Sequence, residues 1–130
     1  MKKHLSLIVF CLCLTGAPAS VSAQAVSCDE ATTTHEMTVC EKAALDTVDE
    51  ELNRVYGALQ VDLDKTSKLL LRDAQRAWIA YRDAECARIA DFARGGTIAP
   101  LLALGCKTKM TADRVSELAR NPLTGETQSY

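Results

Sequence analysis

Residues 74–86 read AQRAWIAYRDAEC and form the most strongly patterned segment of the chain. It contains the only tryptophan of the chain and has neither glycine nor proline, so it favours a helix. Leu71, Ala74, Trp78 and Tyr81 recur at spacings of three and four, which places them on one face of that helix. We therefore predict that the stretch lies in a core helix and that these four side chains form its packing stripe.

An apolar seam upstream follows the alternating spacing of three and four residues that is typical of packed helices. Its members are Leu45, Val48, Leu52, Val55 and Leu59. The seam predicts a helix over residues 45–63, and the core helix is predicted over residues 69–93. Asp64 lies in the polar turn between them, where it suits a helix N-cap. The two helices are expected to run antiparallel and to pack seam against seam.

Shorter helices are predicted on both sides of this hairpin. Thr33 and Glu36 have the spacing of a capping box, which begins a short helix before the seam. Gly95-Gly96 ends the second long helix, and Pro100 begins a short helix after it. A last helix of about ten residues is expected to end at Asn121-Pro122. The predicted fold class is therefore all-α, a small disulfide-stapled helical bundle built on a long antiparallel hairpin, with short helices at both ends.

The first 23 residues have the pattern of a secretory signal peptide. Met1-Lys2-Lys3 is basic, residues 5–14 are apolar, and Val21-Ser22-Ala23 supplies small residues at the cleavage site. The apolar run has about ten residues, whereas a membrane-spanning helix needs roughly twenty. We predict cleavage after Ala23, with Ala25 as the alternative. The mature protein is expected to be periplasmic or secreted from a bacterium without a membrane anchor, with a helical domain over residues 24–120 and a disordered tail over residues 121–130.

Four cysteines follow the leader: Cys28, Cys40, Cys86 and Cys106. An even number in a small exported chain predicts two disulfides. Their spacings of 12, 46 and 20 residues contain none of the close pairs of zinc sites, so no metal or other cofactor is expected. If the hairpin turns near Asp64, Cys40 and Cys86 lie level across it, which favours Cys40–Cys86 together with Cys28–Cys106. Pairing Cys28–Cys40 with Cys86–Cys106 remains the alternative.

The charge of the chain bears on its partners. Removing Lys2 and Lys3 with the leader leaves 13 basic side chains against 17 acidic ones, a net charge of −4. This mild acidity disfavours nucleic acids and anionic membranes and suits a basic protein partner. The sequence shows no Ser-His-Asp order, no Cys-His pair with a free thiol and no phosphate-binding loop. We therefore predict a binding protein and not an enzyme.

A set of motifs between the four cysteines resembles the LprI-like family, which is named after a lysozyme inhibitor of mycobacteria. The resemblance covers residues 28–118 and rests on Asp49, Leu52-Asn53, Tyr56, Gln75-Arg76-Ala77-Trp78, Arg82-Asp83 and Gly95-Gly96. It implies an exported, helical, disulfide-bonded domain. The motif residues are interpreted as mainly structural, with Trp78 as a core anchor and with Arg82 and Asp83 in partly buried ion pairs.

The same resemblance implies inhibition of a lysozyme, that is, of a muramidase. We predict non-covalent occlusion, in which an acidic surface attracts a basic lysozyme and a projecting segment blocks its cleft. The predicted partner contact is Arg94, Gly95, Gly96 and Thr97, in the glycine-rich segment after the core helix. Two alternatives are an immunity protein against another periplasmic toxin and a structural or stress-response envelope protein with no enzyme target.

Overall fold

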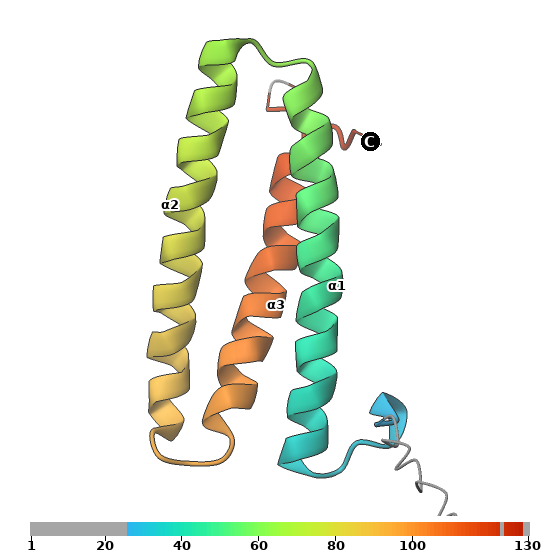
Figure 1. Cartoon of the computed structure of the whole chain (residues 1–130), viewed down its shortest axis with the longest axis vertical. Helices are drawn as coiled ribbons and strands as arrows, with labels where there is room; N and C mark the ends of the chain where they lie inside the picture. Colours follow the sequence, from blue (N-terminus) through green and yellow to red (C-terminus); the bar gives the residue numbers. More distant parts are fainter. Residues whose placement is uncertain (1–25, 123, 129–130) are drawn as a thin grey trace, which may run out of the picture.

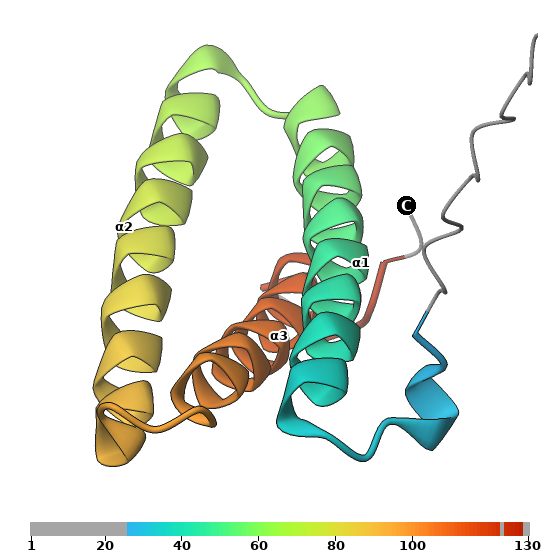
Figure 2. The same cartoon turned by 60° about the horizontal axis from the view of Figure 1, so that its bottom comes forward.

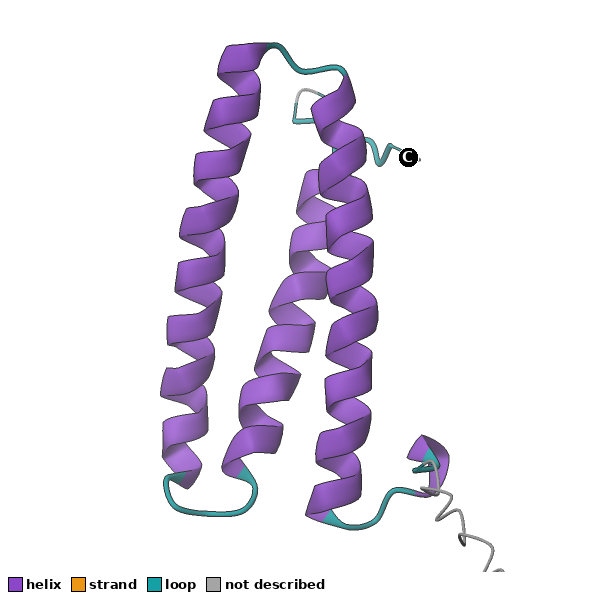
Figure 3. Cartoon of the chain, viewed as in Figure 1, coloured by secondary structure: helices purple, strands orange, loops and turns teal. Residues whose placement is uncertain are grey.

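The computed structural model describes residues 26–122 and 124–128, and the predicted signal peptide lies outside them. The described elements are, in chain order, η1 (Cys28–Glu30), α1 (Thr34–Val61), α2 (Lys65–Ala90), η2 (Asp91–Ala93) and α3 (Ala99–Leu118). Three long helices and their short connections make up nearly all of this part of the chain (Figure 3). The predicted all-α class is confirmed.

Side chains cap the long helices at the predicted positions. Thr33 Oγ1 accepts a hydrogen bond from the Glu36 N–H at 3.2 Å, and Glu36 Oε2 accepts one from the Thr33 N–H at 2.9 Å. This reciprocal pair is the predicted capping box. It begins α1, which continues to Val61, so the separate short helix predicted before the seam is wrong. Asp64 accepts from the Ser67 N–H at 2.8 Å and begins α2. The predicted turn between the two long helices is therefore confirmed.

The third long helix decides how the bundle packs. α1 and α2 run antiparallel, and α3 lies between them on one side of the plane that they define (Figures 1 and 2). α1 packs extensively on α3, and α2 also packs mainly on α3. The predicted seam-against-seam contact between α1 and α2 is therefore wrong. A helix of 20 residues is long enough to cover the apolar faces of both neighbours, so the hairpin helices do not need to cover each other.

The core lies where α1 meets the end of α3. Leu52 and Val55 of α1 form a buried cluster with Leu118 and Ala119, and Trp78 of α2 packs against it. In the predicted α1 seam, Leu45, Leu52 and Val55 are buried and the other two residues are partly buried; the main partner of α1 is α3. Leu71 also packs against this core, whereas Ala74 is exposed and Tyr81 is 60% exposed. The predicted α2 stripe is therefore only half correct, because α2 has one extensive helical neighbour and buries a narrower strip of its surface.

One continuous helix replaces the two short helices predicted near the C-terminus. α3 begins beside Pro100, as expected, but it passes through Gly105 without a break. A single glycine weakens a helix by only about 1 kcal/mol, and contacts on two sides offset this cost. Beyond α3, two backbone hydrogen bonds join described residues near the end of the helix. The Gln128 N–H donates to the Ala119 carbonyl at 2.8 Å, and the Asn121 N–H donates to the Glu126 carbonyl at 2.8 Å.

Two disulfides join Cys28 to Cys40 and Cys86 to Cys106, with Cα–Cα distances of 5.6 and 5.4 Å. The favoured pairing of Cys40 with Cys86 and of Cys28 with Cys106 is therefore wrong, and the alternative is correct. The favoured pairing assumed that α1 and α2 touch at the open end of the hairpin. Because α3 lies between them there, Cys86 faces Cys106 on α3, while Cys40 holds the short segment that precedes α1.

Candidate functional site

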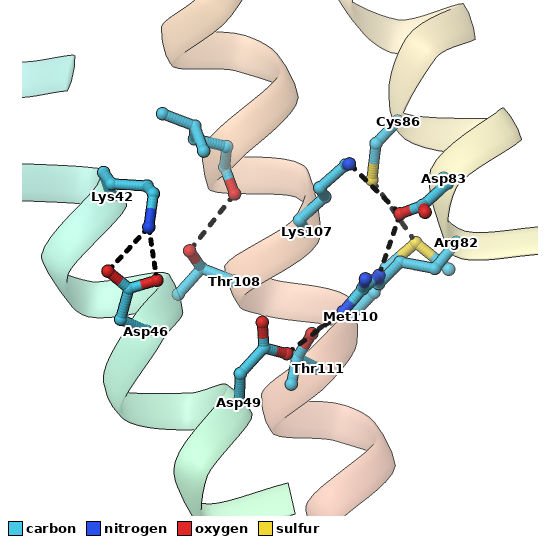
Figure 4. A network of polar contacts seen from close by, with 11 residues as sticks. Lys42, Asp46, Asp49, Arg82, Asp83, Cys86, Lys107, Thr108, Met110 and Thr111 are labelled. Carbon is cyan, nitrogen blue, oxygen red and sulfur yellow. Dashed lines mark hydrogen bonds and ion pairs between the residues drawn. The ribbon is translucent and has the colours of Figure 1, made fainter. Parts of the chain in front are cut away.

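A buried guanidinium connects all three long helices. The Arg82 side chain on α2 is 12% exposed. It donates to Asp49 Oδ1 on α1 at 3.1 Å and to Thr111 Oγ1 on α3 at 3.0 Å (Figure 4). It also donates to Asp83 Oδ1 at 3.2 Å. Because Thr111 is fully buried, this contact fixes the depth at which α2 lies against α3.

Two cationic side chains lie against the ring of Trp78. The Arg82 guanidinium carbon is 5.2 Å from the centroid of the indole ring, and that of Arg114 is 5.7 Å from it. Both distances lie within the range of cation–π attraction. Arg114 is itself held by Gln75, whose Oε1 accepts from its Nε at 3.1 Å. The Gln-Arg-Ala-Trp motif thus contributes two residues to the contact between α2 and α3.

Asp83 joins α2 to α3 through a second cation. Its Oδ1 lies 3.1 Å from Lys107 Nζ on α3, and Arg82 contacts the same oxygen (Figure 4). Partial burial acts to raise the pKa of Asp83, but the hydrogen bond from Lys107 and the charges of Arg82 and Lys107 outweigh it. The pKa of this carboxyl therefore lies below its ordinary value.

The lowered pKa of Asp83 predicts a loss of stability in acid. A carboxyl whose pKa is lower in the folded state stabilises the fold above the unfolded pKa of about 3.9, and this contribution disappears as the pH falls through the folded value. We expect the Asp83→Asn variant to melt below the wild type at pH 7 and the difference to shrink as the pH approaches 2. Thermal unfolding of the variant and the wild type, followed by circular dichroism from pH 7 to pH 2, measures the difference in melting temperature. A difference that stays constant over this range would contradict the assignment.

The connection between α2 and α3 forms an exposed end of the bundle, which we call the end loop (residues 91–98). Phe92 is 84% exposed and Ile98 is 44% exposed. The Arg94 side chain is 80% exposed, and two hydrogen bonds of 2.6 and 2.7 Å to the Asp91 carboxylate hold it. Gly95 has a φ of +77°, a conformation that glycine adopts without strain. The end loop therefore presents an aromatic ring and a cation to solvent on a well-defined turn.

The predicted partner contact, from Arg94 to Thr97, lies within the end loop. Phe92, which the prediction did not include, is exposed in the same loop. The periodicity assigned Phe92 to the core helix, where an aromatic residue is usually buried. In the structure, α2 ends at Ala90 and a single 3₁₀ turn carries Phe92 outward. A large aromatic residue three positions before two consecutive glycines was the available signal in the sequence.

Several further motif residues lie along a groove between α1 and α2, which we call the α1–α2 groove. Leu52, Asn53 and Tyr56 line it on α1, together with Asp49, and Arg76 and Ile79 line it on α2. The motif is therefore divided between contacts that hold the helices together and positions that face this groove. Within the described residues, no group of three His, Cys, Asp or Glu side chains is arranged to hold a metal ion.

Comparison with known proteins identifies the family. Residues 28–118 match the family described as Lysozyme inhibitor LprI. The chain belongs to the LprI family. It is also 33% identical over 120 residues to an uncharacterized protein of Rhizobium meliloti (strain 1021), an alignment that covers 82% of this chain and 86% of that relative. No solved structure matches the chain.

The LprI family match agrees with the structure at both ends of the matched region. Cys28 begins it and forms the first disulfide, and Leu118 ends it as the last residue of α3. The match therefore coincides with the three-helix unit and its two disulfides. Among residues 26–122 and 124–128, no helix has the length and apolarity needed to cross a membrane.

Proposed function

We propose that the protein is exported and inhibits a lysozyme by non-covalent occlusion of the substrate cleft. The observation that carries this proposal is the LprI family match over residues 28–118, nearly the whole described chain. The two disulfides support export, because such bonds persist in oxidising compartments outside the cytoplasm. The signal-peptide pattern of the first 23 residues supports it independently.

The end loop is the element that we propose enters the cleft. Muramidases act with two carboxyl groups that flank the scissile bond of a polysaccharide. Phe92 offers apolar surface to the sugar-binding walls of such a cleft, and Arg94 offers a cation to its carboxylates. Asp91 holds Arg94 before binding, so less side-chain entropy is lost when the complex forms. The net charge of −4 after the leader would increase the rate of encounter with a basic lysozyme.

The test is a turbidity assay in which lysozyme clears a suspension of bacterial cell walls. We expect the purified protein to slow clearing at micromolar concentration. The Phe92→Ala/Arg94→Ala variant should need about tenfold more protein or higher, because truncating central aromatic and arginine contacts typically costs this much affinity. Val61→Ala is the matched control, since Val61 is 74% exposed at the opposite end of the bundle. Absence of inhibition against several lysozyme types would refute the proposal.

A further inference from the structure

The α1–α2 groove has the size of a site for a small ligand. Its volume is about 350 Å³, and all of its lining residues come from α1 and α2. Sites for small molecules typically start at about 300 Å³, so the groove is large enough for a small ligand. Leu52 and Ile79 provide apolar surface in it, and the other lining residues are polar or aromatic.

The polar residues of the groove fall into two classes. Asp49, Arg72, Gln75 and Arg82 are bonded to other side chains of the fold. Asn53, Tyr56 and Arg76, by contrast, make no hydrogen bond or ion pair within the described residues. These three side chains face the same groove from two helices, Asn53 and Tyr56 from α1 and Arg76 from α2. Their amide, phenol and guanidinium groups are therefore available to hydrogen-bond to a ligand.

One of the three arginines that line the groove has no ion-pair partner in the part of the chain that the structure describes. Arg72 pairs with Asp73, and Arg82 pairs with Asp49 and Asp83. Arg76 makes no ion pair within the described residues, so its guanidinium is the cation that the groove offers to a ligand. Such a cation favours an anion over a cation or a neutral molecule. An unpaired guanidinium matches a planar carboxylate, which it binds through two parallel hydrogen bonds.

We propose that the α1–α2 groove binds the free carboxylate end of a short peptide with small apolar side chains. Arg76 pairs with the terminal carboxylate. Asn53 and Tyr56 hydrogen-bond to the adjacent peptide group, and Leu52 and Ile79 contact the side chains. Such an end occurs on proteins, where the residues are L-amino acids, and on the stem peptides of bacterial cell walls, which end in D-alanine. The proposal does not depend on lysozyme inhibition, because the end loop contributes no residue to the groove.

The experiment titrates the isotope-labelled protein with N-acetyl-D-Ala-D-Ala and, separately, with N-acetyl-L-Ala-L-Ala, followed by NMR. We expect saturable shifts of the backbone amides around residues 52–56 and 75–79 with at least one of the two. Preference for the D-peptide identifies a cell-wall source, and preference for the L-peptide identifies a protein C-terminus. The C-terminal amide of the same peptide should bind about tenfold more weakly, because it lacks the charge that Arg76 recognises.

Two variants make the assignment specific. Arg76→Gln should weaken binding about tenfold and leave the fold intact, because Arg76 has no partner among the described residues. Arg88→Gln is the control, the same substitution on α2 outside the groove, and should leave binding unchanged. Arg76→Gln should also keep lysozyme inhibition, and Phe92→Ala/Arg94→Ala should keep peptide binding. The proposal is overturned if neither peptide binds, if the amide binds as well as the acid, or if Arg76→Gln binds normally.

Discussion

Replacing both Cys86 and Cys106 with alanine is expected to lower the free energy of unfolding by about 3 kcal/mol. The bond closes a loop of 20 residues, and the chain-entropy model assigns this amount to a loop of such a length. The Cys86 side chain is fully buried, and Met110 Sδ lies 3.7 Å from its sulfur (Figure 4). Removal of the bond therefore frees the unfolded chain and also disturbs the contact between α2 and α3. The melting temperature should fall by about 15 °C.

The matched control is the Cys28→Ala/Cys40→Ala variant, which removes the other disulfide. The chain-entropy model gives its loop of 12 residues nearly the same value. We nevertheless expect a loss of about 1 kcal/mol or less, because every residue of η1 is exposed. Without the bond, this segment gains freedom in the folded state as well, which offsets the gain in the unfolded state. Urea unfolding measures the free energy of unfolding of both variants. The expectation is contradicted if the two variants lose the same amount, or if the Cys28→Ala/Cys40→Ala variant loses more.

Arg82→Ala is expected to lower the free energy of unfolding by about 2 kcal/mol. The variant removes the cation that Asp49 and Asp83 share and leaves the buried Thr111 hydroxyl without its donor. Breaking a fully buried ion pair costs about 3–5 kcal/mol. The smaller value follows because the Asp49 and Asp83 side chains are 40% and 46% exposed, so water partly replaces the lost partner.

Two further variants separate the Arg82 contacts from a general loss of charge. Arg82→Lys keeps the charge but cannot reach Asp49 and Thr111 in the same planar arrangement, so it should be intermediate. Arg88→Ala removes an exposed arginine of the same helix and should leave stability essentially unchanged. A double-mutant cycle of Arg82→Ala with Asp49→Asn should show clear coupling. If the two losses are additive, the hydrogen bond from Arg82 to Asp49 contributes little to the free energy of unfolding.

The local signals in the sequence were sufficient for the helix caps and the apolar seam, but not for the length of every helix or for the way the helices meet. Thr33 and Asp64 act through hydrogen bonds to residues three positions away, so their roles as caps were predictable. The burial of Val55 followed from its place in a periodic seam. The continuity of α3 through Gly105 was not predictable, because it depends on contacts with two helices distant in the sequence. The error in disulfide pairing followed directly, since it assumed that nothing lies between α1 and α2.

In the candidate site too, local features were predictable from the sequence and long-range contacts were not. The motif around Trp78 indicated a structural centre, and the structure places two guanidinium groups against its ring, with their carbons 5.2 and 5.7 Å from the ring centroid. The second of these, Arg114, lies 36 positions away, and no short-range pattern connects the two. Phe92 was missed because periodicity alone cannot show where a helix ends in a 3₁₀ turn. Asn53 and Arg76 were found only as motif letters, because a groove exists only once two helices are placed.

The connectivity of the disulfides has a consequence for biogenesis. Each of the four described cysteines is bonded to its neighbour in the order of synthesis, Cys28 to Cys40 and Cys86 to Cys106. If the chain crosses a membrane with its N-terminus first, as its proposed export implies, Cys40 emerges when Cys28 is the only other one of these four outside. The first bond can then close before Cys86 appears, and the last two cysteines are left with each other. An oxidase alone would suffice for such a chain, whereas bonds that skip a cysteine commonly require an isomerase and the slow rearrangement that it catalyses.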